Sequence, residues 1–152
     1  GLSVRVSSIE GREITGANGI KIVADSDFID EILDDYDAII LPGGTTGAEH
    51  FFAFPALDKA LKQFAKNNNL VGAICASPAI VLAGFGLLDT KKATCYPAYK
   101  HLIKNYVDEK VVVDGTIITS QGPGTALLFA LRVAEILAGS AIAQKVKAGM
   151  LA

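Results

Sequence analysis

The sequence is poor in the residues that build disulfide-bonded or metal-held folds. Its 152 residues include only two cysteines, Cys75 and Cys95, and two histidines, His50 and His101. There is no CxxC pair, so we expect neither a disulfide framework nor a zinc site, and we predict no metal and no cofactor. Unpaired thiols without a signal peptide are typical of a reducing compartment, which predicts a cytoplasmic location.

Long apolar runs and an excess of one charge are also missing. No run approaches the ~20 residues of a membrane helix, so no membrane association is expected. The 14 basic and 16 acidic residues are well mixed, with a net charge of -2, which argues against a nucleic-acid partner. The hydrophobic content of 51% nevertheless gives a mean hydropathy of +0.39. Such values favour an α/β fold with strands covered on both faces, or further burial in an oligomer.

The order of apolar patterns predicts alternating strands and helices with one inserted hairpin, arranged as a three-layer α/β sandwich in a single domain. We expect strands over residues 2–8, 20–23, 36–41 and 70–74, and a hairpin over 111–119 that turns at Asp114-Gly115. Helices are expected over residues 28–33, capped by residues 25–27, and over 57–66, 79–83, 126–137 and 141–148. The helix at 126–137 is broadly apolar and is expected to pack on the sheet.

Cys75 lies where a strand turns sharply into a helix. The residues before it form a short apolar run, and Pro78 fits the first turn of the helix that follows. Free backbone N–H groups and the positive end of a helix dipole would then lie beside the thiol. Such surroundings can lower a thiol pKa from about 8.5 to roughly 3.5–7.5. Cys75 is therefore either a reactive thiolate or a small buried apolar residue.

Two glycine-rich loops could contribute to chemistry. Gly43-Gly44 follows a predicted strand and should lie at the same sheet edge as Cys75. The N–H groups of Gly44 and Ala76 could then converge into an oxyanion hole, or stabilise an oxidised sulfur, although a plain tight turn is the alternative. Residues 121–125 precede a helix and could receive an anion, but neither loop carries a nucleotide-binding motif.

A base for Cys75 is not evident in the sequence. A nucleophilic cysteine normally has a base within hydrogen-bond reach. His50 and His101 each fall in a predicted helix, where an exposed position is the simpler interpretation. No carboxylate pairs with Cys75 in sequence. Asp25, Asp27, Asp34 and Asp35 are interpreted as helix caps or solvated charges.

Three motifs in register resemble the ThiJ/PfpI superfamily. They are residues 39–44 (IILPGG), 73–78 (AICASP) and 119–125 (TSQGPGT). The resemblance covers residues 1 to about 148 and is greatest to the branch of the Parkinsonism-associated deglycase and its bacterial relatives. It implies a flavodoxin-like sandwich of the class I glutamine amidotransferase type, and a homodimer.

The resemblance also implies roles for particular residues. Cys75 matches the nucleophile-elbow cysteine, which oxidises readily to sulfinic acid, and Gly44 and Ala76 match the backbone donors facing it. We further expect a site lining that comprises Gly43, Ser77, Cys95, Tyr96, Gly122 and Pro123. The activities implied are glutathione-independent conversion of methylglyoxal to lactate, protein or nucleotide deglycation, redox sensing and chaperone action.

Three departures from the family pattern qualify these expectations. Ala76 stands where protease-like members have a histidine, so peptidase activity is not expected. Cys95 matches a position where some relatives carry a histidine, and it could act as a resolving thiol or simply pack in the core. Residues 1–152 also show no counterpart of the family's first strand and helix, which carry a glutamate that hydrogen-bonds the cysteine. We therefore expect a truncated or nicked domain, with the segment that carries that glutamate either present as a separate N-terminal fragment or lost.

Three functions stay open at this point. Cys75 could add to the aldehyde of a small α-oxoaldehyde as a catalytic nucleophile. Alternatively, its oxidation could make the protein a stress sensor or regulated chaperone with little turnover. The third possibility is a structural α/β domain with an inert cysteine.

Overall fold

The computed structural model describes residues 1–152, which form two compact units: a smaller unit of residues 1–36 and a larger unit of residues 37–152. None of the helices combines the length and the apolar character needed to cross a membrane.

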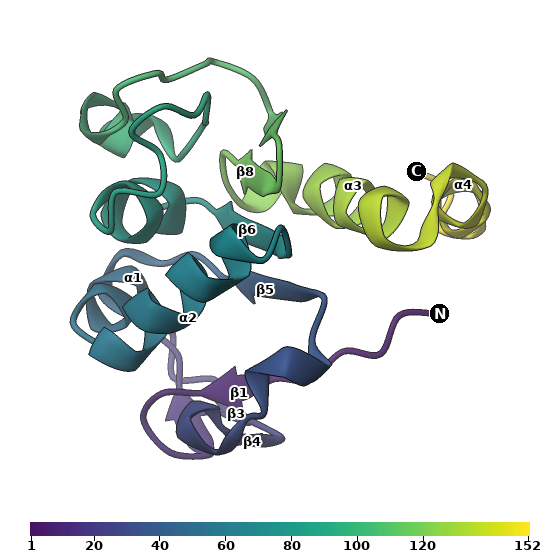
Figure 1. Cartoon of the computed structure of the whole chain (residues 1–152). Helices are drawn as coiled ribbons and strands as arrows, with labels where there is room; N and C mark the ends of the chain where they lie inside the picture. Colours follow the sequence, from purple (N-terminus) through teal and green to yellow (C-terminus); the bar gives the residue numbers. More distant parts are fainter. The chain divides into compact units, whose positions relative to one another are not determined.

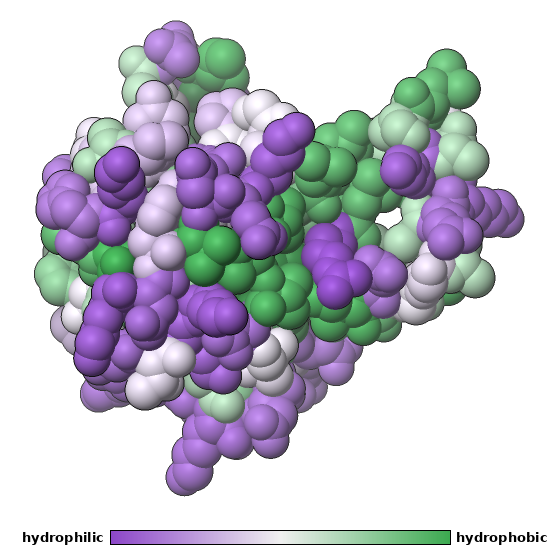
Figure 2. Space-filling model, turned by 90° about the horizontal axis from the view of Figure 1, so that it is seen from above, coloured by the Kyte–Doolittle hydropathy of each residue, from purple (hydrophilic) through white to green (hydrophobic).

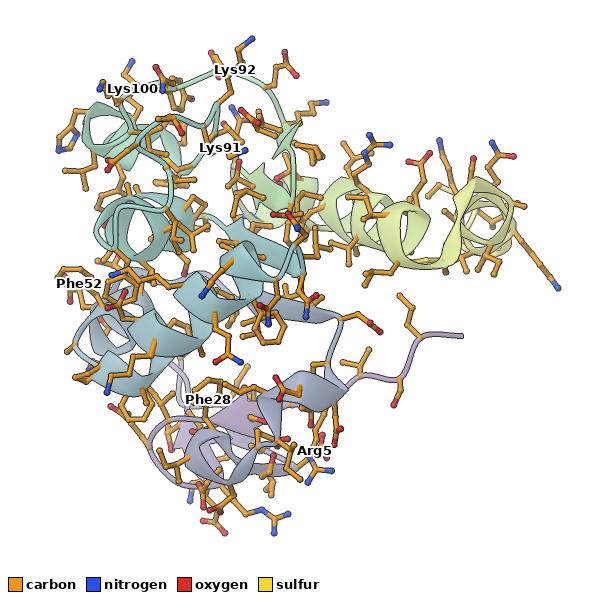
Figure 3. The ribbon with its side chains drawn as sticks, viewed as in Figure 1. Arg5, Phe28, Phe52, Lys91, Lys92 and Lys100 are labelled. Carbon is orange, nitrogen blue, oxygen red and sulfur yellow. The ribbon has the colours of Figure 1, made fainter.

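The larger unit is built on a four-stranded sheet with the strand order β5-β6-β8-β7 (Figure 1). Strands β5 (Ala38–Leu41), β6 (Leu70–Ile74) and β8 (Ile117–Ser120) are parallel. Strand β7 (Val111–Asp114) pairs antiparallel with β8 and confirms the predicted hairpin. Gly115 occupies the turn with φ +64°, and the ammonium of Lys91 lies 3.3 Å from the Asp114 carboxylate beside it (Figure 3).

Four α-helices belong to the larger unit: α1 (Thr45–Phe52), α2 (Pro55–Lys66), α3 (Ala126–Ala138) and α4 (Ser140–Gly149). Shorter helical turns are η3 (Pro78–Ala83), η4 (Pro97–Leu102) and η5 (Pro123–Thr125). The predicted stripe of α2 is confirmed, because Leu57, Leu61 and Phe64 are all buried. Helix α1 was predicted only as a helix around His50, without bounds, because its first turn is rich in threonine and glycine, which are weak helix formers.

Helix α3 packs on the sheet through one face only. Phe129 joins Leu70 and Ile118 in a buried cluster. Gly72 permits this close packing, since a Cβ there would lie 3.1 Å from Cζ of Phe129. Other apolar side chains of α3 stay exposed, among them Leu127, Leu128 and Ile136. Figure 2 shows hydrophobic residues gathered on the surface of the molecule. The expectation that α3 packs on the sheet is therefore confirmed for that one face.

The smaller unit contains two short strand pairs. Strand β1 (Ser7–Ser8) pairs parallel with β4 (Ser26–Asp27), and β2 (Glu13–Thr15) pairs antiparallel with β3 (Lys21–Val23). The predicted strand over residues 2–8 was too long, because only its last two residues pair.

The predicted helix over residues 28–33 was wrong. Two single turns, η1 (Phe28–Asp30) and η2 (Leu33–Asp35), take its place. The expected caps are engaged elsewhere: the Asp25 carboxylate accepts the Val6 N–H at 2.9 Å, and the Ser26 hydroxyl donates to Glu31. The chain therefore lacks the capping bonds that would start a regular helix here.

A single carboxylate organises the smaller unit. Glu31 accepts hydrogen bonds from Ser26, Tyr36, Ser7 and Arg5, the last two at 2.8 and 2.9 Å. These hydrogen bonds, first among them that from Ser26, lower the pKa of Glu31 to about 2. Arg5 reaches this carboxylate from the chain segment before β1 (Figure 3). Polar contacts with Glu31 thus link segments of the smaller unit from residue 5 to residue 36.

Candidate functional site around Cys75

Three loops of the larger unit leave the same edge of the sheet. They follow β5, β6 and β8, which are parallel neighbours, so their carboxyl ends coincide. The first loop contains Gly43 and Gly44, the second contains Cys75, and the third spans residues 121–125. Cys75 follows the middle strand. The predicted common sheet edge of its loop and the Gly43-Gly44 loop is confirmed, and the two loops also leave neighbouring strands.

Cys75 adopts a backbone conformation that is unusual for its residue type. Its φ is +65°, in the left-handed region that side chains disfavour. The conformation is held from both sides, because the Cys75 N–H donates to Ser120 O at 2.9 Å and its carbonyl accepts the Tyr96 N–H at 2.8 Å. Strained residues of this kind persist only where surrounding contacts enforce them, and they cluster at functional sites. The side chain is half-buried, so solvent can reach it.

The glycine loop lies directly against this cysteine. A Cβ on Gly43 would stand 2.5 Å from Cβ of Cys75 and 3.3 Å from its sulfur, so no larger residue fits. The buried Ser77 hydroxyl donates to Pro42 O at 2.5 Å and links the two loops. Gly43 and Ser77, both predicted to line the site, therefore hold the two loops together around Cys75.

Two backbone N–H groups of the Cys75 and glycine loops have no acceptor. The N–H groups of Gly44 and Ala76 donate to no acceptor within the chain, whereas both carbonyls are engaged by the following turns. Gly44 has φ +98°, a conformation that suits glycine. Unpaired N–H groups beside a nucleophile can bind an oxyanion that forms there.

Helix η3 begins at Pro78, as expected, but is a π-helix of six residues. Gly84, at its end, lies under the Phe52 ring, which stacks on Phe85 with centroids 5.1 Å apart (Figure 3). A Cβ on Gly84 would lie 2.6 Å from Phe52 Cε2. The end of η3 is therefore packed closely against α1.

Cys95 and Tyr96 have different surroundings. Cys95 is fully buried, and its thiol donates to Tyr96 O at 3.3 Å. Burial, followed by the nearby Cys75, raises the Cys95 pKa to about 11, so this thiol stays protonated at neutral pH. These features favour a packing role over a resolving role for Cys95. The Tyr96 side chain is exposed at the surface.

The third loop satisfies its own polar groups. The Thr125 hydroxyl accepts the Gly122 N–H at 3.1 Å and lies 2.6 Å from the Ser120 hydroxyl. Because the Gly122 donor is already used, the loop does not present it to an anion as the sequence suggested. Pro123 is exposed at the start of η5, and Gly122 lies beside the Tyr96 ring.

No base contacts the Cys75 sulfur. Across residues 1–152, neither a carboxylate nor an imidazole is hydrogen-bonded to the Cys75 sulfur. His50 and His101 are both exposed, as predicted. The site therefore holds a nucleophile and two donors, and it lacks a proton carrier.

Comparisons with known proteins place these features in context. Residues 1–136 match the DJ-1/PfpI family. Protein dj-1beta of Drosophila melanogaster is 38% identical over 99% of this chain and 83% of its own length. Protein DJ-1 homolog B of Arabidopsis thaliana is 45% identical over 81% of this chain, but this chain spans only 28% of that longer protein.

Solved structures agree with the fold. Oxidized DJ-1 of Toxoplasma gondii superposes with a TM-score of 0.91 at 35% identity, covering 97% of this chain and 82% of that one. Drosophila melanogaster DJ-1beta superposes with a TM-score of 0.87 at 36% identity, covering 93% and 77%. The expected flavodoxin-like α/β sandwich is therefore confirmed.

Proposed function

Because this chain belongs to the DJ-1/PfpI family, we propose that it is a carbonyl-stress enzyme that converts methylglyoxal to lactate through Cys75, without glutathione. The observation that carries the proposal is the strained, half-buried Cys75, in a loop packed against the glycine loop, together with the unpaired N–H groups of Ala76 and Gly44 in these two loops. Deglycation of proteins or nucleotides would use the same attack of the thiolate on a carbonyl-derived carbon.

The proposed reaction balances without an oxidant. The Cys75 thiolate forms a C–S bond to the aldehyde carbon, and the C=O electron pair moves to oxygen, where the Gly44 and Ala76 N–H groups stabilise it. Protonation of that oxygen gives a hemithioacetal. The proton on this carbon is then removed and the neighbouring ketone oxygen is protonated, which gives an enediol. Return of a proton to the neighbouring carbon and loss of the proton from the first oxygen give the thioester of lactate. Water cleaves the thioester, releasing lactate and the thiol, so that the net change is addition of one water.

The proton carrier is proposed to be a carboxylate from an N-terminal fragment outside residues 1–152. The free edge of β5, the outer strand of the sheet, supports this assignment because a further strand could pair there. Ile40 on that strand is 40% exposed. Intact-mass measurement of the purified protein tests the idea: a companion peptide containing a glutamate is expected, and a single 15.9 kDa species would remove the two-chain version.

The decisive experiment compares two cysteine variants. Cys75→Ser is expected to abolish methylglyoxal consumption, whereas Cys95→Ser, which alters a buried thiol with a pKa of about 11, is expected to keep most of it. Lactate is measured by an enzyme-coupled assay, and folding is checked by circular dichroism. Unchanged turnover in Cys75→Ser would rule out the proposed chemistry.

A second candidate function is redox sensing through Cys75. One observation favours it: the related Toxoplasma gondii DJ-1 was solved in a state described as oxidized. The donors of Gly44 and Ala76 would also stabilise a sulfinate on Cys75. Mass spectrometry after mild peroxide should find added oxygen on Cys75 and none on buried Cys95. A Cys75 peptide without added oxygen would eliminate the sensor.

We also propose a homodimer in a cytoplasmic compartment. Exposed apolar side chains on α3 and α4 support self-association (Figure 2): Leu127, Leu128, Ile136, Ile142 and Val146. Two unpaired cysteines are compatible with a reducing compartment. Light scattering coupled to size-exclusion chromatography tests the dimer. A molar mass of one chain, both at high protein concentration and after 50-fold dilution, would contradict it.

A further inference from the structure

Two tyrosines form an aromatic wall that the proposed chemistry does not use. The rings of Tyr96 and Tyr99 have centroids 6.5 Å apart and are tilted by 50°, within the range of attractive aromatic pairs. The Tyr99 hydroxyl lies 2.7 Å from the Thr45 hydroxyl. Gly122 also lies close to the Tyr96 ring, since a Cβ at Gly122 would lie 3.5 Å from Cδ2 of Tyr96. The Tyr96 ring is thus braced by Tyr99 and flanked by Gly122.

This aromatic wall is attached to the loops of the Cys75 site at three points. The Tyr96 N–H donates to the Cys75 carbonyl at 2.8 Å, so the two residues lie side by side. Thr45, the partner of Tyr99, follows directly after Gly44, whose N–H is one of the two free donors. Gly122 belongs to the loop after β8, the strand next to the one that leads to Cys75. The two tyrosines are therefore linked to the loop of Cys75, to the start of α1 beside Gly44 and to the third loop.

The wall is open to a ligand. Tyr96 is 45% exposed although its main chain is fixed, so one ring surface is available at little cost in side-chain entropy. An aromatic ring of this kind attracts flat apolar groups, and aromatic pairs contribute beyond their buried area. A methyl group, as in methylglyoxal, would use little of this surface.

We propose that the Tyr96 ring, braced by Tyr99, binds the substituent of the α-oxoaldehyde, so that the protein prefers aryl-substituted α-oxoaldehydes over methylglyoxal. The inference depends on the proposed function for its reaction, in which phenylglyoxal and one water give mandelate by the same steps at Cys75. Tyr96 is then a specificity-determining residue, and Tyr99 positions it.

The kinetic test compares kcat/KM for phenylglyoxal and methylglyoxal. The wild-type ratio is expected to favour phenylglyoxal, and Tyr96→Ala and Tyr96→Leu should each lower the ratio about 2- to 12-fold, the range expected for loss of one aromatic pair. Tyr96→Phe should retain the ratio, because the aromatic ring is kept. Tyr106→Phe serves as the control, because the Tyr106 hydroxyl donates to Asp108 and the residue is not part of the aromatic wall. An unchanged ratio in Tyr96→Ala and Tyr96→Leu would overturn the inference.

A binding test separates this inference from the reaction itself. In the Cys75→Ser protein, mandelate and lactate are titrated while the amide NMR signals of Tyr96 and Gly122 are followed. Tighter binding of mandelate that is lost in the Cys75→Ser, Tyr96→Ala double variant supports the aromatic wall even if no turnover is found. Equal affinity for the two acids, or no shift at these amides, refutes it. Absence of Cys75-dependent turnover refutes only the proposed function.

Discussion

The two units of the chain are stabilised in different ways. Residues 37–152 surround a four-stranded sheet with buried apolar side chains, whereas residues 1–36 contain strands of two or three residues joined by the Glu31 contacts. In the smaller unit Val4, Ile22 and Ile32 are all more than half exposed. The larger unit can therefore rely on hydrophobic burial, and the smaller one relies on hydrogen bonds, of which Glu31 accepts four.

This difference matters for the site. Every residue of this chain that is proposed to act in chemistry lies in the larger unit, where the sheet fixes the positions of the loops. Sites on rigid elements hold reacting groups within narrow limits of distance and angle. Perturbing the smaller unit should therefore change local stability without altering the geometry at Cys75.

The largest expected effect comes from the core of the larger unit. Phe129→Ala should destabilise the protein by about 3–5 kcal/mol, because it empties a buried position between α3 and the sheet. Ile32→Ala, at a 68% exposed position in the smaller unit, should change stability by less than about 0.5 kcal/mol. Urea denaturation measures both. A large cost for Ile32→Ala would mean that the apolar residues of the smaller unit are covered in solution.

The next effect concerns Glu31. Glu31→Gln should cost about 1.5–3 kcal/mol at pH 7, because it removes the charge from a group that accepts four hydrogen bonds. The folded pKa of Glu31, about 2, lies below its ordinary 4.5. The stabilisation is therefore complete above pH 4.5 and is lost as the pH falls towards 2.

Hydrogen exchange localises this prediction. Amides of residues 7–36 should exchange faster in Glu31→Gln than in wild type at pH 7, and the difference should shrink by pH 3. Glu13→Gln, which changes an exposed carboxylate on β2, is the matched control and should behave as wild type. Equal protection in the Glu31 variant and wild type at pH 7 would show that the carboxylate does not hold the unit together.

A pair of glycine variants examines how tightly the site is packed. Gly43→Ala should destabilise by about 1–3 kcal/mol and reduce alkylation of Cys75, since the new methyl would overlap Cβ of that residue. Gly47→Ala, in α1 with open space around it, should instead stabilise by about 0.5–1 kcal/mol. Thermal unfolding and the rate of iodoacetamide labelling are measured. Normal labelling in Gly43→Ala would show that the two loops can separate.

The success of sequence-based prediction also differs between the units. The strands around Gly72 and the hairpin at Gly115 were predicted because apolar periodicity and turn residues agree there with the tertiary packing. In the smaller unit, Asp25 and Ser26 had the pattern of helix caps, yet Val6 and Glu31 engage them. Such contacts join residues that are five to 19 positions apart in the sequence. They produce no periodic pattern of apolar residues from which they could be predicted.

The candidate site was only partly predictable for a similar reason. Cys75, Gly44 and Ala76 follow from local motifs, and so does their common sheet edge. The fit of Gly43 against the thiol and the contact between Thr45 and Tyr99 depend on loops that are 32 and 54 positions apart in sequence. Only the folded structure shows that Tyr99, which no motif marks, braces Tyr96 beside the cysteine.

The smallest expected effect is on the surface of α2. Lys62 lies 2.7 Å from Asp58 one helical turn away and 5.9 Å from the centre of the Phe85 ring. Lys62→Gln should cost only about 0.3–0.5 kcal/mol, because an exposed i,i+4 pair gains little over its interactions with water. The cost should shrink further in 1 M NaCl, where charges are screened within about 3 Å. Denaturation with urea at low and high salt measures it, and a cost that persists in 1 M NaCl would assign the stabilisation to the contact with Phe85 instead of the ion pair.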